Sequence, residues 1–283
     1  MRNIVVIALL LGVLSSVCLY DSGRGYLDPQ GPIYLQSPDV EELDLYDGIQ
    51  LVTYNLKFCE QPSLLTEDLM RLETLKQADV LLFQEVVGVP RRENCVQDLA
   101  RSLSYYAVFI PAMRHPKNNL DFGNAILSRW PIENVHKIVL PHKHLIWRTH
   151  RVALMATIRH PEHPFDVATV HLETLLGSSE LRIEQARFVF EQLPSERPVL
   201  VSGDWNTFFE SDVLRLELEA QQYDLINMTE DIVDTRPSVI GPWKLDHTFG
   251  RGFKSWKAGV ESEAKGSDHL PLWHELELLD LNR

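Results

Sequence analysis

Positive charge is scarce in this chain of 283 residues, which has 27 Lys and Arg against 40 Asp and Glu and a net charge of −13 at pH 7. That balance argues against a protein that holds nucleic acid on a broad basic surface, although it leaves room for a local basic cleft. Cysteine is scarce too, with three residues. No second Cys or His lies close to Cys59 or Cys95, so no cysteine-based metal cluster is indicated. A glycine-rich nucleotide fingerprint is also absent, which argues against a cofactor-dependent enzyme.

The first 20 residues are typical of a secretory signal peptide. Arg2 precedes an apolar run over residues 4–14, and small residues follow it. The run is shorter than the roughly 20 apolar residues of a spanning helix, so an uncleaved anchor is the second alternative. Cys18 offers a third, a lipoprotein cleaved before it, although Val17 is atypical ahead of a lipidated cysteine. We therefore expect a secreted, periplasmic or cell-envelope protein.

After removal of the signal, Cys59 and Cys95 would remain. In an exported chain they could form one disulfide, or they could be two buried thiols. Residues 21–48 are rich in Gly, Pro and Asp and predict a linker or N-terminal arm. Residues 49–283 are long enough for one α/β domain.

The hydrophobic pattern of this domain predicts many strands and few long helices. Helices are expected over residues 63–77, 93–103, 178–193 and 209–221. Strands are expected over residues 49–55, 79–85, 105–110, 123–132, 135–140, 151–160, 165–172, 199–201, 243–249 and 253–260, with a closing strand after His269. We expect 253–260 to pair with 243–249 as a hairpin. The pattern fits a two-sheet α/β sandwich.

The stretch Pro198–Thr207 is the most informative. Val199 to Val201 predict a buried strand, and Gly203 would allow a tight turn at its end. Asp204 and Asn206 follow two apart, so both side chains could point the same way. A carboxylate beside an amide suits a metal ion, a water or a phosphate oxygen, although the same residues form ordinary turns.

Polar side chains recur at other strand ends. Each has an ordinary explanation alone, as a turn, a loop carboxylate or a structural histidine. Together they form a candidate site: Asn55, Glu85, His171, Asp204, Asn206, Asp246, Asp268 and His269.

The short sequence motifs around these residues resemble those of the endonuclease/exonuclease/phosphatase superfamily. In order they are Thr-Tyr-Asn, Phe-Gln-Glu-Val, Thr-Val-His-Leu, Gly-Asp-Trp-Asn, Leu-Asp-His and Ser-Asp-His-Leu-Pro, and they run from about Ile49 to Leu278. The resemblance implies a DNase I-like four-layer α/β sandwich, with two mixed sheets packed face to face and helices outside. It also implies a divalent-metal-dependent hydrolase that cleaves a phosphodiester by in-line attack of water.

The resemblance assigns the metal to Asn55 and Glu85, with Asp268 supporting the metal or the neighbouring loop. The cofactor would be Mg²⁺, a hard ion that favours oxygen ligands, with Mn²⁺ or Ca²⁺ as substitutes.

The remaining implied roles are catalytic. Asp204 and Asn206 would lie against the scissile phosphate, and His171 would contact the phosphate or protonate the leaving group. Asp246 and His269 would form a carboxylate–imidazole pair, with His269 as the general base.

Phosphate binding is predicted for Arg148 and Arg151, at the most cationic part of the chain, residues 141–151, and for Asn124. The substrate stays open between nucleic acid and a phospholipid or inositol phosphate. Phe253 and Trp256 could form an aromatic tip for lipid, or the core and rim of a hairpin. A catalytically silent binding protein is a further alternative, disfavoured because every expected position is occupied. We expect a monomer without an obligate protein partner.

Overall fold

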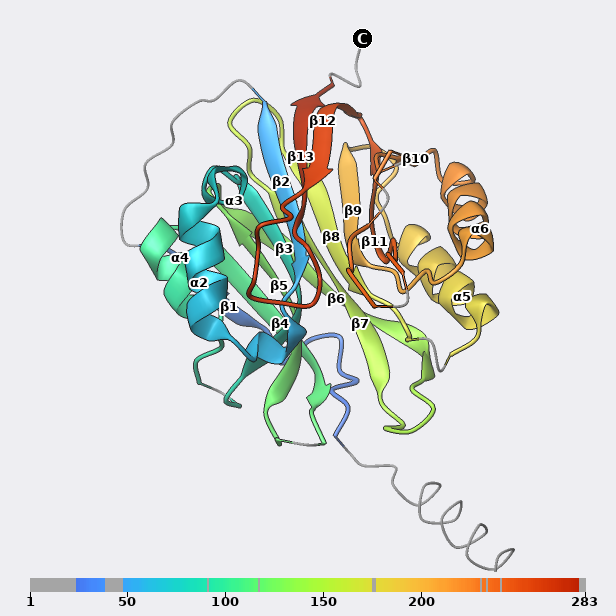
Figure 1. Ribbon diagram of the computed structural model, residues 1–283, viewed down its shortest axis with the longest axis horizontal. Helices are drawn as coiled ribbons and strands as arrows, with labels where there is room; N and C mark the ends of the chain where they lie inside the picture. Colours follow the sequence, from blue (N-terminus) through green and yellow to red (C-terminus); the bar gives the residue numbers. More distant parts are fainter. Residues whose placement is uncertain are drawn as a thin grey trace, which may run out of the picture.

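The computed structural model describes residues 24–38, 48–90, 92–116, 118–174, 177–229, 231–232, 234–239 and 241–279. Two β-sheets form the inner layers of a sandwich and pack face to face, with helices on both outer sides (Figure 1). The seven-stranded sheet has the order β1-β4-β5-β3-β2-β13-β12, and the six-stranded sheet has the order β10-β11-β9-β8-β7-β6. Each sheet contains parallel and antiparallel pairs, so both are mixed.

The strands of the seven-stranded sheet are β1 (Tyr34–Gln36), β2 (Ile49–Asn55), β3 (Val80–Gly88), β4 (Tyr106–Arg114), β5 (Asp121–Ser128), β12 (Phe253–Val260) and β13 (Leu272–Leu278). Those of the six-stranded sheet are β6 (Ile132–Lys143), β7 (His150–Ile158), β8 (Phe165–His171), β9 (Val199–Asp204), β10 (Ile226–Asn227) and β11 (Asp246–Arg251). The helical elements are η1 (Lys57–Cys59), α2 (Pro62–Arg71), α3 (Glu73–Lys76), α4 (Gln97–Leu103), α5 (Ser179–Phe190) and α6 (Glu210–Gln221).

Alternation along the strands produces three hydrophobic layers. On β2, Val52 and Tyr54 face helix residues such as Leu69, whereas Leu51 faces the other sheet and packs with Leu154. On the opposite side, strands β8 and β9 pack against α5 and α6 in a third cluster. The four-layer sandwich predicted from the sequence is therefore confirmed.

Two predicted elements differ from the structure in their extent. The helix expected over 63–77 is broken at Leu72, whose ψ of 118° is extended, so α2 and α3 are separate. Of the helix expected over 93–103, only Gln97–Leu103 is helical. By contrast, α5 begins as predicted, with the Ser178 side chain accepting a hydrogen bond from the Leu181 N–H.

The predicted hairpin of 243–249 with 253–260 is wrong. Strand β11 pairs with β9, whereas β12 pairs with β13 in the other sheet. Consecutive strands change sheets at Gly252, which has a φ of 78°. Phe253 is buried in the core between the sheets, and Trp256 is exposed on β12, where its indole N–H donates to Glu277.

The N-terminal arm expected over 21–48 contributes the edge strand β1, which pairs with β4. In the described part of the chain, no helix is both long and apolar enough to cross a bilayer. The apolar run at 4–14, and with it the predicted signal peptide and Cys18, lies outside the described residues.

Candidate active site

The site is built where the carboxyl ends of four strands meet. Strands β2 and β3 run parallel in one sheet, with Asn55 opposite Gln84, and β8 and β9 run parallel in the other, with His171 opposite Asp204. Asn55 Nδ2 donates to Asp204 Oδ2 at 3.0 Å and so joins the two sheets. Residues remote in the chain therefore share one edge of the sandwich.

Gly203 does not form the tight turn predicted from the sequence, but lies within β9 beside the site. No turn follows Val201, because β9 continues through Gly203 to Asp204. A Cβ at Gly203 would lie 2.1 Å from the Val170 carbonyl oxygen, and its φ is +149°. Glycine is needed for the close approach of β8 and β9 beside the site.

Glu85 is turned into the site by its backbone. Its φ is 55°, and the pairing of β3 with β5 shifts register around it. Asn55 Nδ2 lies 3.3 Å from Glu85 Oε1, while Asn55 Oδ1 accepts the Lys57 backbone N–H at 3.0 Å. The Asn55 amide nitrogen, rather than its oxygen, thus faces the two carboxylates. Burial raises the pKa of Glu85 to about 7, although the charge of Arg151 opposes the shift.

His171 lies between Arg151 and the carboxylates. Arg151 Nη1 lies 3.2 Å from His171 Nδ1, and His171 Nε2 lies 3.6 Å from Asp204 Oδ2 and 3.8 Å from Glu85 Oε1. Burial, followed by the positive charge of Arg151, holds the pKa of His171 well below its ordinary value. Because the guanidinium donates to Nδ1, the neutral ring carries its proton on Nε2 and presents a donor to the carboxylates.

Asp246 and His269 form the predicted pair. His269 Nδ1 lies 2.8 Å from Asp246 Oδ2, and His269 Nε2 lies 3.8 Å from Asp204 Oδ2. Burial alone would lower the pKa of His269, but the charge and hydrogen bond of Asp246, followed by the charge of Asp204, raise it to about 9. Burial raises the pKa of Asp204, and the charge of His269 opposes that shift. At neutral pH the pair therefore presents an imidazolium to the cleft.

Asn206 and Asp268 complete the predicted set. The Asn206 backbone N–H donates to Asp204 Oδ1 at 3.0 Å, and its Nδ2 donates to the Leu172 carbonyl at 3.1 Å. Arg236 Nη2 donates to Asp268 Oδ2 at 2.9 Å. Burial alone would raise the pKa of Asp268, but the Arg236 hydrogen bond and nearby positive charges lower it below its ordinary value.

A cleft of about 430 Å³ opens over these groups. It is lined by six of the predicted residues, Glu85, His171, Asp204, Asn206, Asp268 and His269. Asn55 and Asp246 lie directly behind them, as the contacts above show. Sequence reasoning missed the other lining residues, which are Lys57, Phe58, Thr174, Phe208, Arg236, Trp243 and Leu245. Trp243 and Leu245 lie within three residues before Asp246, and Lys57 and Phe58 lie within three residues after Asn55, so proximity to the motifs was the available signal.

The three predicted phosphate-binding residues are placed differently, and none is among the described residues that line the cleft. Arg151 is buried behind His171, with its guanidinium 5.9 Å from the centre of the Phe122 ring. Asn124 donates to the Val152 carbonyl across the sheets. Arg148 is exposed, in the loop between β6 and β7.

The oxygen-rich end of the cleft fits a divalent cation. Glu85 and Asp204 share Asn55 as a hydrogen-bond donor, and burial raises the pKa of both because it disfavours negative charge. A bound cation would stabilise such neighbouring carboxylates. Within the described ranges, no three or more His, Cys, Asp and Glu side chains are grouped to enclose a metal ion. One or two carboxylates with several waters is the usual binding mode of Mg²⁺.

Comparison with solved structures relates this arrangement to known proteins. An endonuclease/exonuclease/phosphatase from Beutenbergia cavernae superposes with a TM-score of 0.67 at 20% identity, covering 83% of this chain and 72% of that one. D. rerio TDP2 complexed with a single-strand DNA product superposes with a TM-score of 0.59 at 17% identity, covering 81% of this chain and 98% of that one. Sphingomyelinase C from Streptomyces griseocarneus superposes with a TM-score of 0.59 at 14% identity, covering 81% of this chain and 99% of that one. These likenesses show a shared fold.

Comparison with curated protein sequences returns no match. The sequence model of the Endonuclease/Exonuclease/phosphatase family matches residues 52–269, well over half of the chain and all the site residues described above. The chain therefore belongs to the endonuclease/exonuclease/phosphatase family, whose members are generally hydrolases of phosphate esters.

Proposed function

We propose that this protein is a divalent-metal-dependent phosphodiesterase in which water attacks the phosphorus in line. The observation that carries the proposal is the facing pair formed by the Asp204 carboxylate and the His269 imidazolium, whose nearest atoms are 3.8 Å apart at the edge of the cleft. Phosphodiester hydrolysis needs a proton acceptor for water and positive charge for the phosphoryl oxygens. This pair supplies one of each.

Asp204 takes the role of proton acceptor. Asn55 and the Asn206 N–H each donate to one of its oxygens, which fixes the carboxylate at the lining of the cleft. Burial raises its pKa and so strengthens it as a base. The sequence prediction gave the base role to His269. The carboxylates of Asp246 and Asp204 on either side of that imidazole favour its charged form instead.

His269 then donates to a phosphoryl oxygen, with Asp246 fixing the ring and its charge. His171 presents Nε2–H into the same cleft and provides a second donor, for the phosphate or the leaving oxygen. The lowered pKa of His171 keeps it neutral, so it donates without adding charge to the site.

Glu85 is the carboxylate that would hold the cation, with Asn55 orienting it and Asp268 across the cleft as a further oxygen donor. When bound, Mg²⁺, or Mn²⁺ or Ca²⁺ in its place, would neutralise phosphate charge and polarise the phosphorus–oxygen bonds.

The cleft walls favour a nucleotide-type phosphodiester. Phe58, Phe208 and Trp243 line the cleft, and aromatic side chains stack with nucleobases regardless of sequence. A DNA product is bound by the structurally similar TDP2, whereas the likeness to sphingomyelinase C keeps a phospholipid or inositol phosphate as the alternative. Trp256 is 66% exposed on β12 but is not among the described residues that line the cleft, so it gives no support to a lipid substrate at this site.

Export is part of the proposal. Cys59 and Cys95 form a disulfide, the arrangement expected of a chain that matures in an oxidising compartment. We propose a secreted or cell-envelope monomer, consistent with the signal-like residues 1–20.

The test is hydrolysis of bis-p-nitrophenyl phosphate, plasmid DNA, RNA, sphingomyelin and phosphoinositides by the purified protein. Mg²⁺ should support turnover and EDTA should abolish it, with added Mg²⁺ or Mn²⁺ restoring it. Glu85→Ala should lose at least about a hundredfold in kcat/KM, because the cation loses its principal carboxylate. Full activity in EDTA would refute the metal-dependent mechanism, and turnover of sphingomyelin alone would replace the nucleotide substrate with lipid.

A further inference from the structure

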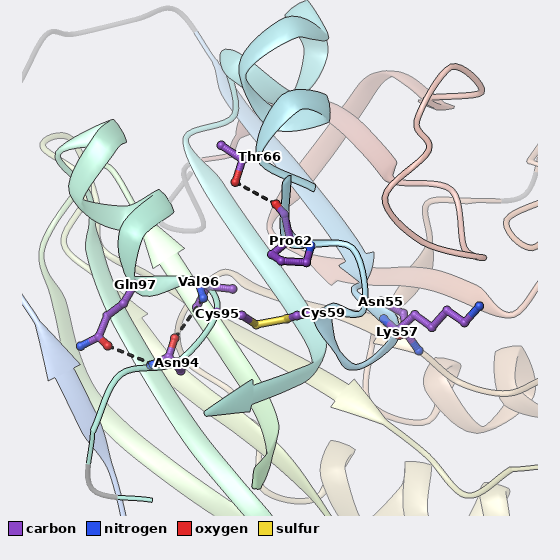
Figure 2. The surroundings of a disulfide bond; sticks show 9 residues. All are labelled: Asn55, Lys57, Cys59, Pro62, Thr66, Asn94, Cys95, Val96 and Gln97. Carbon is purple, nitrogen blue, oxygen red and sulfur yellow. Dashed lines mark hydrogen bonds between the residues drawn. A yellow bond between two sulfur atoms is a disulfide. The ribbon is translucent and has the colours of Figure 1, made fainter. Parts of the chain in front are cut away.

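Lys57 brings a positive charge to the cleft that none of the roles above uses. Lys57 lines the cleft together with Glu85 and Asp204. Figure 2 shows its side chain extending away from the Cys59–Cys95 disulfide, on the opposite side of the turn. The Lys57 backbone N–H donates to Asn55 Oδ1 at 3.0 Å, so its position is linked to the residue that orients the carboxylates.

The cleft needs such a charge, because its lining carboxylates would repel an anionic substrate. The guanidinium of Arg236 is engaged with Asp268 at 2.9 Å, and that of Arg151 contacts His171 from behind. Lys57 Nζ instead pairs with Glu60 Oε2 at 3.6 Å, with 38% and 56% of the side chains exposed. A surface pair of this kind is screened by solvent and contributes little, so the ammonium can exchange it for a phosphate.

The backbone that carries Lys57 is unfavourable on its own. Lys57, Phe58 and Cys59 have φ values of 45°, 56° and 49°, three consecutive non-glycine residues in the left-handed region. L-residues rarely adopt this conformation in series, because Cβ crowds the following carbonyl. Surrounding contacts must therefore hold the turn in place.

The disulfide is the strongest of these contacts. Cys59 is bonded to Cys95, whose backbone N–H donates to the Val87 carbonyl of β3 at 2.9 Å. The turn is thereby tied to the strand that carries Glu85 (Figure 2). On the other side, the Phe58 ring packs at 5.1 Å from Phe122.

We propose that Lys57 is a substrate-phosphate-binding residue and that the Cys59–Cys95 disulfide positions it, an inference that rests on the proposed phosphodiester chemistry of this cleft. Reduction of the disulfide would weaken phosphate binding by releasing the left-handed turn. The oxidised protein is then the form with the full phosphate site.

The first experiment measures binding of inorganic phosphate by calorimetry to the oxidised wild type and to Lys57→Met, Lys57→Arg and Glu60→Gln. Lys57→Met should raise the Kd at least about tenfold, because a charge-assisted contact is lost. Lys57→Arg should stay within about threefold of the wild type because it keeps the charge. Glu60→Gln should bind phosphate at least as tightly as the wild type, because it removes the carboxylate that pairs with the Lys57 ammonium.

Equal affinities of wild type and Lys57→Met, or no phosphate binding by the wild type, would overturn the inference. Binding can be measured without turnover, so the two proposals can fail separately. A protein that binds phosphate through Lys57 but hydrolyses no phosphodiester with Mg²⁺ would overturn the proposed function alone.

The second experiment repeats the titration at 10 °C after reduction by a phosphine, with circular dichroism recording the fold. Reduction should raise the Kd of the wild type about tenfold and leave that of Lys57→Met unchanged, because both perturbations act through one ammonium. An unchanged Kd in the reduced wild type would overturn the positioning role. Global unfolding on reduction would overturn it too, since the bond would then hold the whole domain rather than this turn.

Discussion

Asp246→Asn separates the two halves of the proposed catalytic pair. Asp246 Oδ2 accepts from His269 Nδ1 at 2.8 Å, and the Asp246 side chain is almost fully buried. Replacing a buried charged acceptor by an amide removes about 1.5–3 kcal/mol of interaction. If that stabilisation is expressed in the transition state, kcat/KM falls about ten- to a hundredfold.

The pH profile makes this prediction specific. The pKa of His269 is raised to about 9 against the effect of burial, so the imidazolium is present below that pH and is lost as pH rises through it. kcat/KM should therefore fall on the alkaline side near pH 9 in the wild type. In Asp246→Asn the main raising cause is gone while burial still lowers the pKa, so this fall should begin at least about one pH unit lower.

The assay is hydrolysis of bis-p-nitrophenyl phosphate with Mg²⁺ from pH 5 to 10. Asp98→Asn is the matched control, since Asp98 pairs with Arg101 on α4 and its side chain is 91% exposed. Its profile should coincide with that of the wild type. An Asp246→Asn variant with an unshifted alkaline limb would refute the cationic role of His269.

Two further predictions concern stability. His274 is fully buried on β13, and burial lowers its pKa to about 3, below the unfolded value near 6.5, so its contribution is complete above pH 6.5 and is lost as pH falls toward 3. Between pH 6.5 and 4.5, the free energy of unfolding of His274→Leu, measured with denaturant, should thus fall by about 2–3 kcal/mol less than that of the wild type. The control His163→Leu, at an exposed position, should follow the wild type. Parallel pH dependences for the wild type and His274→Leu would contradict this prediction. Cys59 and Cys95 are 36 residues apart, so Cys59→Ser with Cys95→Ser should lower the free energy of unfolding by about 3–4 kcal/mol on the chain-entropy estimate. Urea unfolding of the oxidised wild type and the double variant measures this difference, and equal midpoints would contradict it.

Much of the site could be predicted from polar residues at strand ends, because the strands of each parallel pair are consecutive along the chain. Asn55 ends β2 and Glu85 lies within β3 after one helical crossover, and His171 and Asp204 end β8 and β9 in the same manner. Carboxyl ends of parallel strands share an edge, so the placement of these four residues follows from the strand pattern.

Contacts between distant segments could not be predicted in this way. The 253–260 strand pairs with β13 in the other sheet, because the chain changes sheets at Gly252, and no local hydrophobic pattern marks that change. Arg151 was predicted to bind the substrate phosphate. The local sequence around it could not show that His171, 20 residues away, would lie between its guanidinium and the cleft. Lys57 reaches the cleft through a left-handed turn held by a disulfide 36 residues away in sequence, and local propensity gives no sign of either.

The central claim is that Asp204 accepts the proton of the attacking water, and Asp204→Asn tests it most directly. This variant keeps the shape of the side chain and removes the base. The measurement is kcat for bis-p-nitrophenyl phosphate at pH 7.5 with saturating Mg²⁺, beside the Kd for inorganic phosphate. We expect kcat to fall about a thousandfold while the Kd stays within a few fold of the wild type. A kcat within tenfold of the wild type would contradict the assignment of Asp204 as the base.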